Sequence, residues 1–538
     1  MINTLDQDKC IGCGTCFKSC SLDVFRIDTD QRAVSPCMAA CPAGTDIRGY
    51  NGLVQQGNME EAARKLHERN PFPAVTGRVC FHPCERDCSR KAVDGAVNIN
   101  GLEQFLGDMN VSEKVSSIRH IEKVAVVGSG PAGLSCAVFL ARMGYPVTVF
   151  EALPEPGGML RYGIPAYRLP NSVIETQIKR LESLGVRFRC STRVGKGGDV
   201  TLEDLRQRGF KAFLLAPGNS LSRKIPLEGA ERPGVLWGVE FLRAVRNNQA
   251  PRFSGKVIVV GGGDVAVDAA ISAKRLGASD VCMVSLESEA ELPAYPHNQA
   301  DARAEGIVFE CGWGPVSIEG TDAVTGLTVR RCLAVRDESG AFHPTFDENT
   351  VRTIAAETII FAIGQAADLA PFTEHVEITR RRTIKTEAVT FETSTPDIFA
   401  AGDAASGPAS VIQAIAGGRE AAYSIDRRLR GGQLLADRAQ QREVVENVPG
   451  EGVLPAPRNE RREIHAEGFG ERRCGFELHE ALAEGMRCMT CGAKARIAYN
   501  DDCMTCYTCE LRCPAGAINV HPFKEPLPRT LEMRCEEA

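Results

Sequence analysis

The sequence predicts an α/β protein built on two strand–turn–helix units, with cysteine-rich segments at both ends. Buried β runs that lead into glycine-rich turns begin at residues 123 and 255, and a third strand-to-helix stretch spans 393–422. Such units are typical of parallel sheets covered by helices. Of the 22 cysteines, nine precede residue 89 and eight follow residue 473. The two ends therefore serve a different chemistry from the body.

The bulk composition limits the class of protein. The chain has 538 residues, 43% of them hydrophobic, and a formal net charge of −6. This length predicts several domains, and the acidic balance favours neither nucleic acid nor a membrane as partner. No 18-residue apolar run occurs, and the first residues lack the basic and apolar regions of a signal peptide. We expect a cytoplasmic protein, in which clustered cysteines bind metal more often than they form disulfides.

The first glycine-rich turn has the pattern of a dinucleotide site. Gly128, Gly130 and Gly133 give G-x-G-x-x-G between a β run and a helix. The first glycine permits the tight turn, the second lets the backbone approach a pyrophosphate, and the third packs helix on strand. Glu151 ends the next strand, where a carboxylate can bind a ribose hydroxyl.

A second turn and a later motif complete the pattern. Gly261, Gly263 and Ala266 give G-x-G-x-x-A after the strand at 257–260, and "AAGDA" follows the short strand of the third stretch. The order of the three resembles flavoproteins with two dinucleotide-binding domains. "GGMLRYGIPAYRLP" (157–170) and "FAIGQAADL" (361–369) are similar to the glutamate synthase small subunit and its relatives, including the flavin half of dihydropyrimidine dehydrogenase.

This resemblance, which covers about residues 37–425, implies two bound nucleotides. The first unit and the third stretch would hold FAD, and the expected contacts are Gly128, Gly130, Pro131, Ala132, Gly133, Glu151, Gly158, Met159, Leu160, Arg168, Val194, Gly402 and Asp403. The inserted unit would hold NAD(H), and the expected contacts are Gly261, Gly262, Gly263, Asp264, Val265, Glu287 and Gly364. One departure is "LAPGN" (215–219), where the family usually has Ala-Thr-Gly; Pro217 should still permit the turn.

The nicotinamide nucleotide is expected to be NADH. Relatives that use NADPH place Tyr-Arg-Arg after the second strand of this unit, where the present chain has Ser285, Leu286 and Glu287. Glu287 would repel a 2′-phosphate and accept a hydrogen bond from a free 2′-hydroxyl. The alternative is that Lys274 or Arg275, on the preceding helix, reaches the phosphate.

The amino-terminal cysteines have iron–sulfur spacing. "CIGCGTCFKSC" supplies Cys10, Cys13, Cys16 and Cys20 with ferredoxin spacing, whereas zinc sites usually use two separated pairs. Ser21 replaces the usual proline, which puts Cys20 in question as a ligand.

Residues 37–105 resemble the helical iron–sulfur domain of the same family, which implies one cluster held by Cys41, Cys80, Cys84 and Glu103. An ordinary helix-surface residue is the alternative for Glu103. The family's other cluster starts with a Cys-x-x-Cys upstream of Cys37, which this chain lacks. We expect the amino-terminal thiolates to replace it, with Cys37 and Cys88 as partners whose assignment stays open.

The carboxyl-terminal cysteines predict at least one more cluster. After a charged linker at 430–473 come the ligand candidates Cys488, Cys491, Cys503, Cys506, Cys509 and Cys513. In ferredoxin spacing, three cysteines bind one cluster and the fourth ligates its neighbour. A second cluster here would need Cys474, Cys535 or a non-cysteine ligand. Three to four [4Fe–4S] clusters are expected in all.

The expected fold is thus α/β with two Rossmann-like dinucleotide-binding domains, an amino-terminal helical iron–sulfur domain and ferredoxin-like segments at both ends. The expected domains are a ferredoxin-like leader (1–36), the helical iron–sulfur domain (37–118), a first segment of the FAD domain (119–254), the NAD(H) domain (255–375), a second segment of the FAD domain (376–429), a linker (430–480) and a ferredoxin-like domain (481–538).

The combination predicts an electron-transfer enzyme that depends on NADH or NAD⁺. No Cys-x-x-Cys occurs between residues 89 and 487, so disulfide reduction is not expected. Hydride transfer moves two electrons, whereas a cluster accepts one at a time, and a flavin can do both. Because the reacting atom belongs to the flavin, no catalytic side chain is required. We expect partners to be other subunits of an oxidoreductase complex or a ferredoxin-like carrier.

The tail at 519–526, "NVHPFKEP", resembles flavoprotein subunits of 2-oxoacid oxidoreductases such as phenylglyoxylate dehydrogenase. The alternatives are the NADPH-dependent small subunit of glutamate synthase, a sulfite-reductase-linked flavoprotein, and a non-catalytic iron–sulfur scaffold.

Overall fold

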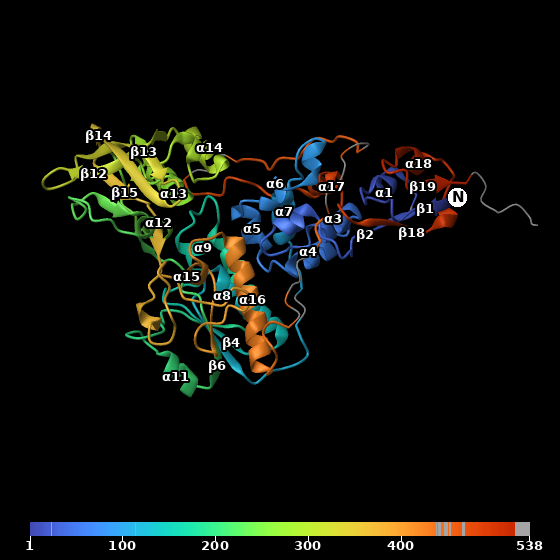
Figure 1. Ribbon diagram of the computed structural model, residues 1–538, viewed down its shortest axis with the longest axis horizontal. Helices are drawn as coiled ribbons and strands as arrows, with labels where there is room; N and C mark the ends of the chain where they lie inside the picture. Colours follow the sequence, from blue (N-terminus) through green and yellow to red (C-terminus); the bar gives the residue numbers. More distant parts are fainter. Residues whose placement is uncertain are drawn as a thin grey trace, which may run out of the picture. The chain divides into compact units, whose positions relative to one another are not determined.

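The computed structural model describes residues 1–521 apart from 23, 113–114, 437, 439–442, 446–449, 451–452 and 465–467. Two compact units divide the chain (Figure 1). Unit 1 comprises Met1–Ser112, Asp437–Arg462 and Cys474–Ala538, and unit 2 comprises Glu113–Ala436 and Glu463–Arg473. None of the helices in the described residues is long and apolar enough to cross a membrane.

The first sheet of unit 2 is parallel and interrupted in sequence, as predicted. Its strand order is β17-β6-β3-β4-β5. The strands are β3 (Lys123–Val127), β4 (Val147–Phe150), β5 (Arg187–Arg189), β6 (Phe210–Leu215) and β17 (Ile398–Ala400). The helices α8 (Pro131–Met143) and α16 (Val411–Leu429) lie side by side (Figure 1). A Cβ on Gly418 of α16 would stand 2.1 Å from the carbonyl oxygen of Ala132, so this glycine allows the close approach.

The second sheet of unit 2 is the inserted domain. Its strand order is β11-β10-β9-β15-β8, with parallel pairing throughout. The strands are β8 (Val235–Trp237), β9 (Val257–Val260), β10 (Val281–Ser285), β11 (Val308–Cys311) and β15 (Thr358–Phe361). β8 falls within the range expected for the FAD domain, yet it pairs with β15. Three antiparallel strands form a separate sheet: β12 (Trp313–Glu319), β13 (Gly326–Arg336) and β14 (Phe342–Ala355).

Shorter elements complete unit 2. The helices are α9 (Met159–Tyr162), α10 (Asn171–Ser183), α11 (Leu202–Gln207), α12 (Gly238–Arg246), α13 (Asp264–Arg275), α14 (Pro296–Ala304) and α15 (Asp403–Ser406). A two-stranded sheet joins β7 (Leu221–Ser222) to β16 (Gln365–Ala366). Some of the expected linker also belongs here, because Phe469 packs on Tyr167 with ring centroids 6.2 Å apart.

Unit 1 contains a helical body made from both ends of the chain. Its helices are α2 (Pro36–Ala40), α3 (Ile47–Gln55), α4 (Met59–His67), α5 (Pro73–Val79), α6 (Pro83–Arg86), α7 (Ile99–Gly107) and α17 (Leu478–Arg487). Tyr50, Leu66, Leu102 and Leu106 are fully buried in its core. α17 packs closely on α3, since a Cβ on Gly485 would stand 2.3 Å from Val54 Cγ1.

The rest of unit 1 joins the two termini into one ferredoxin-like body. β1 (Ile2–Leu5) pairs antiparallel with β19 (Ile518–Val520), and β2 (Phe25–Asp28) pairs antiparallel with β18 (Lys494–Ile497). The helices α1 (Thr15–Ser19) and α18 (Thr508–Arg512) follow equivalent cysteine motifs. The sequence suggested two separate ferredoxin-like segments. One body forms instead, because a two-stranded segment cannot bury enough apolar surface alone.

Candidate cofactor and iron–sulfur sites

The first glycine-rich turn has the geometry of a nucleotide cradle. A Cβ on Gly128 would stand 2.2 Å from the Ala216 carbonyl oxygen, and one on Gly133 would stand 2.0 Å from the Gly128 carbonyl oxygen. Both glycines are therefore required by backbone packing. Gly130 differs, because nothing lies within 4 Å of the position of its Cβ. The open space beside the second glycine fits a pyrophosphate that approaches the backbone at the start of α8.

Glu151 follows β4 and lies against this turn. Its Oε2 accepts hydrogen bonds from the Ser129 backbone N–H at 3.0 Å and from the Ser129 hydroxyl at 2.5 Å. Its Oε1 accepts one from the Leu153 N–H at 2.9 Å. The residue is 7% exposed, and its carboxylate is held beside the cradle, which is the place expected for a ribose contact.

The other residues expected around FAD lie on neighbouring elements of the same sheet. Gly402 and Asp403 follow β17 and begin α15, and burial raises the pKa of Asp403 to about 6. Gly158 approaches the cradle, since its Cβ would stand 2.8 Å from Gly130 Cα. Val194 is buried. Arg168 is occupied within unit 2, because its Nη1 donates to Asp268 Oδ2 of α13 at 2.7 Å.

The second glycine-rich turn repeats the geometry of the first. A Cβ on Gly261 would stand 2.4 Å from the Ala362 carbonyl oxygen, whereas Gly263 has nothing within 4 Å of its Cβ position. Glu287 lies over the turn, with Oε2 2.9 Å from the Cβ position of Gly262. Asp264 has a structural role, because its Oδ1 accepts from the Tyr295 N–H at 3.1 Å and from Asn298 Nδ2 at 2.7 Å.

The remaining expected contacts, Pro131, Ala132, Met159, Leu160, Val265 and Gly364, lie on the helix starts and loops of these two sheets.

Site A gathers the four ligands implied by the family resemblance. Burial raises the pKa of each thiol in the group, and the Glu103 charge raises it further. The group is Cys41, Cys80, Cys84 and Glu103. Glu103 is 8% exposed, so it is not a helix-surface residue. Burial raises its pKa to about 7 against hydrogen bonds donated by the Thr76 hydroxyl at 3.1 Å and by Asn70 Nδ2 at 2.6 Å.

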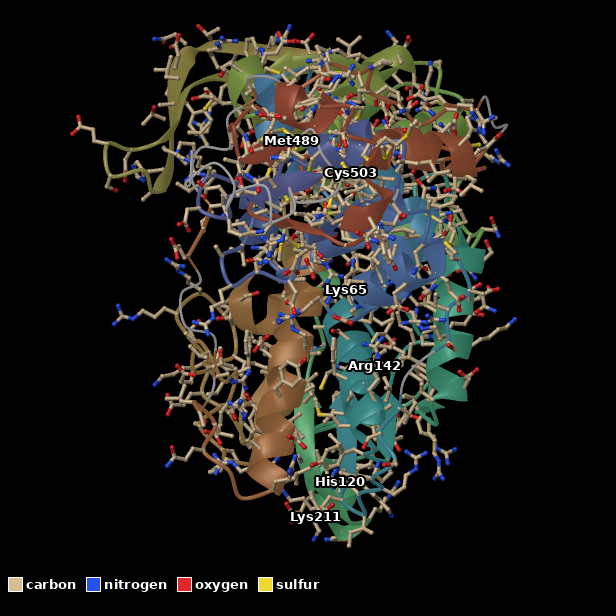
Figure 2. The ribbon with its side chains drawn as sticks, turned by 90° about the vertical axis from the view of Figure 1, so that its right-hand side faces the viewer. Lys65, His120, Arg142, Lys211, Met489 and Cys503 are labelled. Atoms are coloured by element: carbon tan, nitrogen blue, oxygen red, sulfur yellow. The ribbon has the colours of Figure 1, made fainter. Side chains whose placement is uncertain are left out.

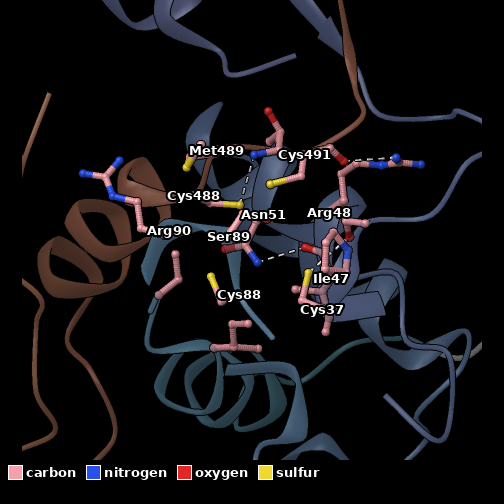
Figure 3. Close-up of a pocket in the computed structure, with 15 residues that line it drawn as sticks. Cys37, Ile47, Arg48, Asn51, Cys88, Ser89, Arg90, Cys488, Met489 and Cys491 are labelled. Carbon is pink, nitrogen blue, oxygen red and sulfur yellow. Dashed lines mark hydrogen bonds between the residues drawn. The ribbon is translucent and has the colours of Figure 1, made fainter. Parts of the chain in front are cut away.

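Site B is lined by cysteines from both ends of the chain (Figure 3). Its thiols are Cys37, Cys88, Cys488 and Cys491. Burial raises the pKa of Cys37, and the Cys488, Cys88 and Cys491 thiols raise it further, while a hydrogen bond with Ser35 opposes them. Burial also raises the pKa of Cys488 to about 12.

Site B corrects the expectation that the amino-terminal thiolates complete the cluster of Cys37 and Cys88. Cys488 and Cys491, which follow α17, line one pocket with Cys37 and Cys88. α17 brings them there because it packs on α3, and Arg487 anchors its last turn. Spacing alone could not reveal this, since the two pairs are about 400 residues apart.

Sites C and D lie in the ferredoxin-like body. Figure 2 labels Cys503, which belongs to the carboxyl-terminal half of this body. Burial, followed by the Cys13, Cys10 and Cys513 thiols, raises the pKa of Cys16 to about 12. Site C is therefore Cys10, Cys13, Cys16 and Cys513. Burial raises the pKa of Cys509 to about 11, with Cys503 and Cys506 acting in the same direction. Cys20 packs on the same core and is the remaining thiol. Site D is therefore Cys20, Cys503, Cys506 and Cys509.

Polar groups around the thiols suit sulfur ligands. The Ala495, Thr505, Ala517 and Thr490 backbone N–H groups each point at a cysteine sulfur, at 3.4, 3.4, 3.3 and 3.4 Å. Tyr50 is fully buried and its hydroxyl has no hydrogen-bond partner among the described residues. Burial raises its pKa, and groups of both site A and site B raise it further, so it interacts electrostatically with both sites. A cluster sulfur would satisfy this hydroxyl.

The described residues hold no group of three or more His, Cys, Asp or Glu side chains arranged for a single metal ion. Cys474 belongs to none of the four groups, and Cys535 lies outside the described residues.

Family comparisons agree with these positions. Residues 122–418 match the family described as pyridine nucleotide-disulphide oxidoreductase. Residues 31–115 match dihydropyrimidine dehydrogenase domain II with its 4Fe-4S cluster, and residues 4–25 match a 4Fe-4S binding domain. FprA from Mycobacterium tuberculosis (the His57Gln mutant) has a TM-score of 0.51 at 20% identity, covering 58% of this chain and 85% of that chain. That likeness concerns the fold alone.

Relatives extend beyond the nucleotide-binding body. The NADP(+)-dependent formate dehydrogenase subunit beta of Moorella thermoacetica is 35% identical over 504 residues, which cover 85% of this chain and 70% of that protein. The NAD-dependent dihydropyrimidine dehydrogenase subunit PreT of Escherichia coli K12 is 36% identical over 404 residues, covering 74% and 92%. The chain therefore belongs to the pyridine nucleotide-disulphide oxidoreductase family, as a glutamate synthase small subunit-like electron-transfer flavoprotein that uses FAD, NAD(P)H and 4Fe-4S clusters.

Proposed function

We propose that the chain is the NADH-linked electron-transfer subunit of a larger oxidoreductase, with [4Fe–4S] clusters at sites A, B, C and D. The observation that supports this most directly is the sorting of the cysteines. Apart from Cys474 and from Cys535, which lies outside the described residues, those outside the nucleotide-binding body fall into four groups of cluster-ligand chemistry in unit 1, while unit 2 carries two nucleotide cradles.

The residues of the chain bind and orient rather than react. Gly130 and Gly263 leave space for a pyrophosphate at the start of α8 and α13, where unpaired backbone N–H groups favour an anion. Glu151 is placed to accept from an FAD ribose hydroxyl, and Glu287 to accept from an adenosine ribose hydroxyl of NADH. When bound, the flavin would exchange a hydride with the nicotinamide and the clusters would carry electrons singly.

The preference for NADH rests on Glu287 and on the engagement of the nearby cations. Lys274 Nζ donates to the Ser279 carbonyl oxygen at 2.8 Å. Arg275 pairs with Glu305 at 2.7 Å and lies over the Tyr167 ring, 4.3 Å from its centroid. Neither is directed to a 2′-phosphate, which weakens the alternative raised by the sequence. A carboxylate over the glycine-rich turn opposes a second negative charge there.

Measuring kcat/KM for NADH and NADPH with one artificial dye tests this preference. The unmodified chain should favour NADH more than tenfold, because a hydrogen bond to a charged group contributes about 1.5–3 kcal/mol. Glu287→Ala should reduce that ratio at least tenfold by weakening NADH and relieving the repulsion of NADPH. Glu289→Ala is the matched control, since Glu289 is exposed and pairs with Arg303 at 2.8 Å. A wild-type preference for NADPH would refute the role given to Glu287.

The proposal also concerns the enzyme with which the chain forms a complex. The carboxyl-terminal resemblance supports a 2-oxoacid oxidoreductase. A formate dehydrogenase is a second candidate, because the formate dehydrogenase beta subunit matches 85% of this chain. The isolated chain should reduce a one-electron dye with NADH and oxidise neither a 2-oxoacid nor formate. Isolation of the native complex and identification of its other subunits separates the two partners, and turnover of either acid by the isolated chain would contradict the proposal.

A further inference from the structure

Lys18 lies where site B and site C meet. It is in α1, between Cys16 of site C and Cys20, and its Nζ donates a hydrogen bond to the carbonyl oxygen of Cys488 in site B at 2.6 Å. The Cys488–Cys491 loop also contacts the site C loop directly, because the Thr490 hydroxyl donates to the Gly12 carbonyl oxygen at 2.7 Å. One ammonium group therefore bridges the two loops that carry ligands of neighbouring sites.

The ammonium is close to groups of both sites. Lys18 Nζ lies 3.6 Å from the position of a Cβ on Gly14, the residue after Cys13 of site C, and it donates to the Cys488 carbonyl oxygen of site B. A positive charge in electrostatic range of two sites interacts with an electron on either.

The charge around site B differs from that around site A. Arg48 Nη1 donates to the Cys491 carbonyl oxygen at 3.3 Å, and Arg90 also lines site B (Figure 3). Site A has carboxylates instead, since Glu103 and Glu85 both raise the pKa of Cys84. One-electron reduction adds one negative charge to a cluster, which cations stabilise and carboxylates oppose.

We propose that the Lys18 ammonium raises the reduction potentials of the clusters at sites B and C above that of the cluster at site A. Lys18 is thus a positioning residue, which acts through the clusters. This rests on the proposed function, which places clusters at these sites. No proton or bond changes in the step, since one electron moves from a reduced to an oxidised cluster. The arrangement makes sites B and C the favoured location for an electron that has passed site A.

Redox titration of the full chain, followed by low-temperature EPR, tests the proposal. Lys18→Met should lower the midpoints of two of the four clusters, with about a tenfold fall in the reduced-to-oxidised ratio at fixed potential, or roughly 59 mV for one electron. Lys18→Arg should retain them. Lys65→Met is the control (Figure 2), because the Lys65 ammonium already lies 3.4 Å from the carboxylates of Asp46 and Glu68.

The iron content of every variant is measured first. If Lys18→Met loses iron, Lys18→Gln removes the charge and keeps a hydrogen-bond donor for the Cys488 carbonyl oxygen. Unchanged midpoints in a variant that retains its iron would overturn the inference and leave the proposed function standing. Absence of clusters at sites B and C in the unmodified chain would overturn the proposed function itself.

Discussion

Replacing Cys488 and Cys491 together by serine should remove one cluster, the one at site B. Four sites predict about 16 irons per FAD, at four per cluster, and the double variant should retain about 12. FAD content should not change, because both nucleotide cradles are in unit 2. Anaerobic iron and flavin analysis, with EPR of the reduced protein, measures both quantities. Cys474→Ser is the matched control, since Cys474 is a carboxyl-terminal cysteine outside all four groups.

A non-additive loss of iron distinguishes site B from a cluster whose ligands all come from the carboxyl-terminal segment. Cys88→Ser should lose the same EPR signal and the same four irons as the double variant. Combining the three substitutions should still leave about 12 irons, because three ligands of the same cluster can cause the loss of that one cluster only. A triple variant with about 8 irons would show that Cys88 and the Cys488–Cys491 pair serve different clusters. That result would refute the grouping of site B.

Two further predictions concern packing. Arg487→Ala should destabilise unit 1 by about 3–5 kcal/mol, because Arg487 is 1% exposed and its loss leaves the fully buried Glu484 with an unpaired charge. Arg462→Ala removes an exposed pair with Glu477 and should cost at most about 1 kcal/mol. Thermal unfolding of the two variants measures the difference. Gly130→Ala should leave the thermal stability of the flavin-free chain unchanged but lower FAD occupancy, whereas Gly133→Ala should destabilise the fold, since its Cβ would meet the Gly128 carbonyl oxygen at 2.0 Å. Equal losses of stability in the two glycine variants would contradict the cradle.

The features that short-range spacing determines could be predicted from the sequence. The two glycine-rich turns are local patterns, and their roles appear in the structure as close backbone approach at Gly128 and open space at Gly130. Residues 60–69 have helical spacing and are followed by Pro71, and the structure has the helix Met59–His67 there. The interruption of the FAD domain also followed from the order of the motifs.

The features that depend on long-range packing could not be predicted. No local pattern links Cys488 to Cys37, because their approach depends on α17 packing against α3. β8 joins the inserted sheet by pairing with β15, which is more than 100 residues later in the chain. Lys18 was overlooked because a lysine between two cysteines has no motif, and its importance arises only from the distant Cys488 carbonyl oxygen. The ferredoxin spacing indicated that Cys513 binds a neighbouring cluster, but not that the other ligands of that cluster are Cys10, Cys13 and Cys16 from the opposite end of the chain.

The ligand grouping has a consequence for the order in which the clusters can be completed. Site A draws its four ligands from residues 41–103, so it needs no ligand from the carboxyl-terminal end, although α17 from that end is part of the helical body around it. Site B needs Cys488 and Cys491, and site C needs Cys513, although their other ligands all precede residue 89. The pairing of β18 with β2 and of β19 with β1 holds the site C thiols of the two ends in one core. Because metal binding to preformed thiols contributes directly to folding free energy, closure of the two termini and filling of sites B and C should be one cooperative step. The two ends of the chain are thus coupled through the clusters they share, while the nucleotide-binding body between them folds around ligands of its own.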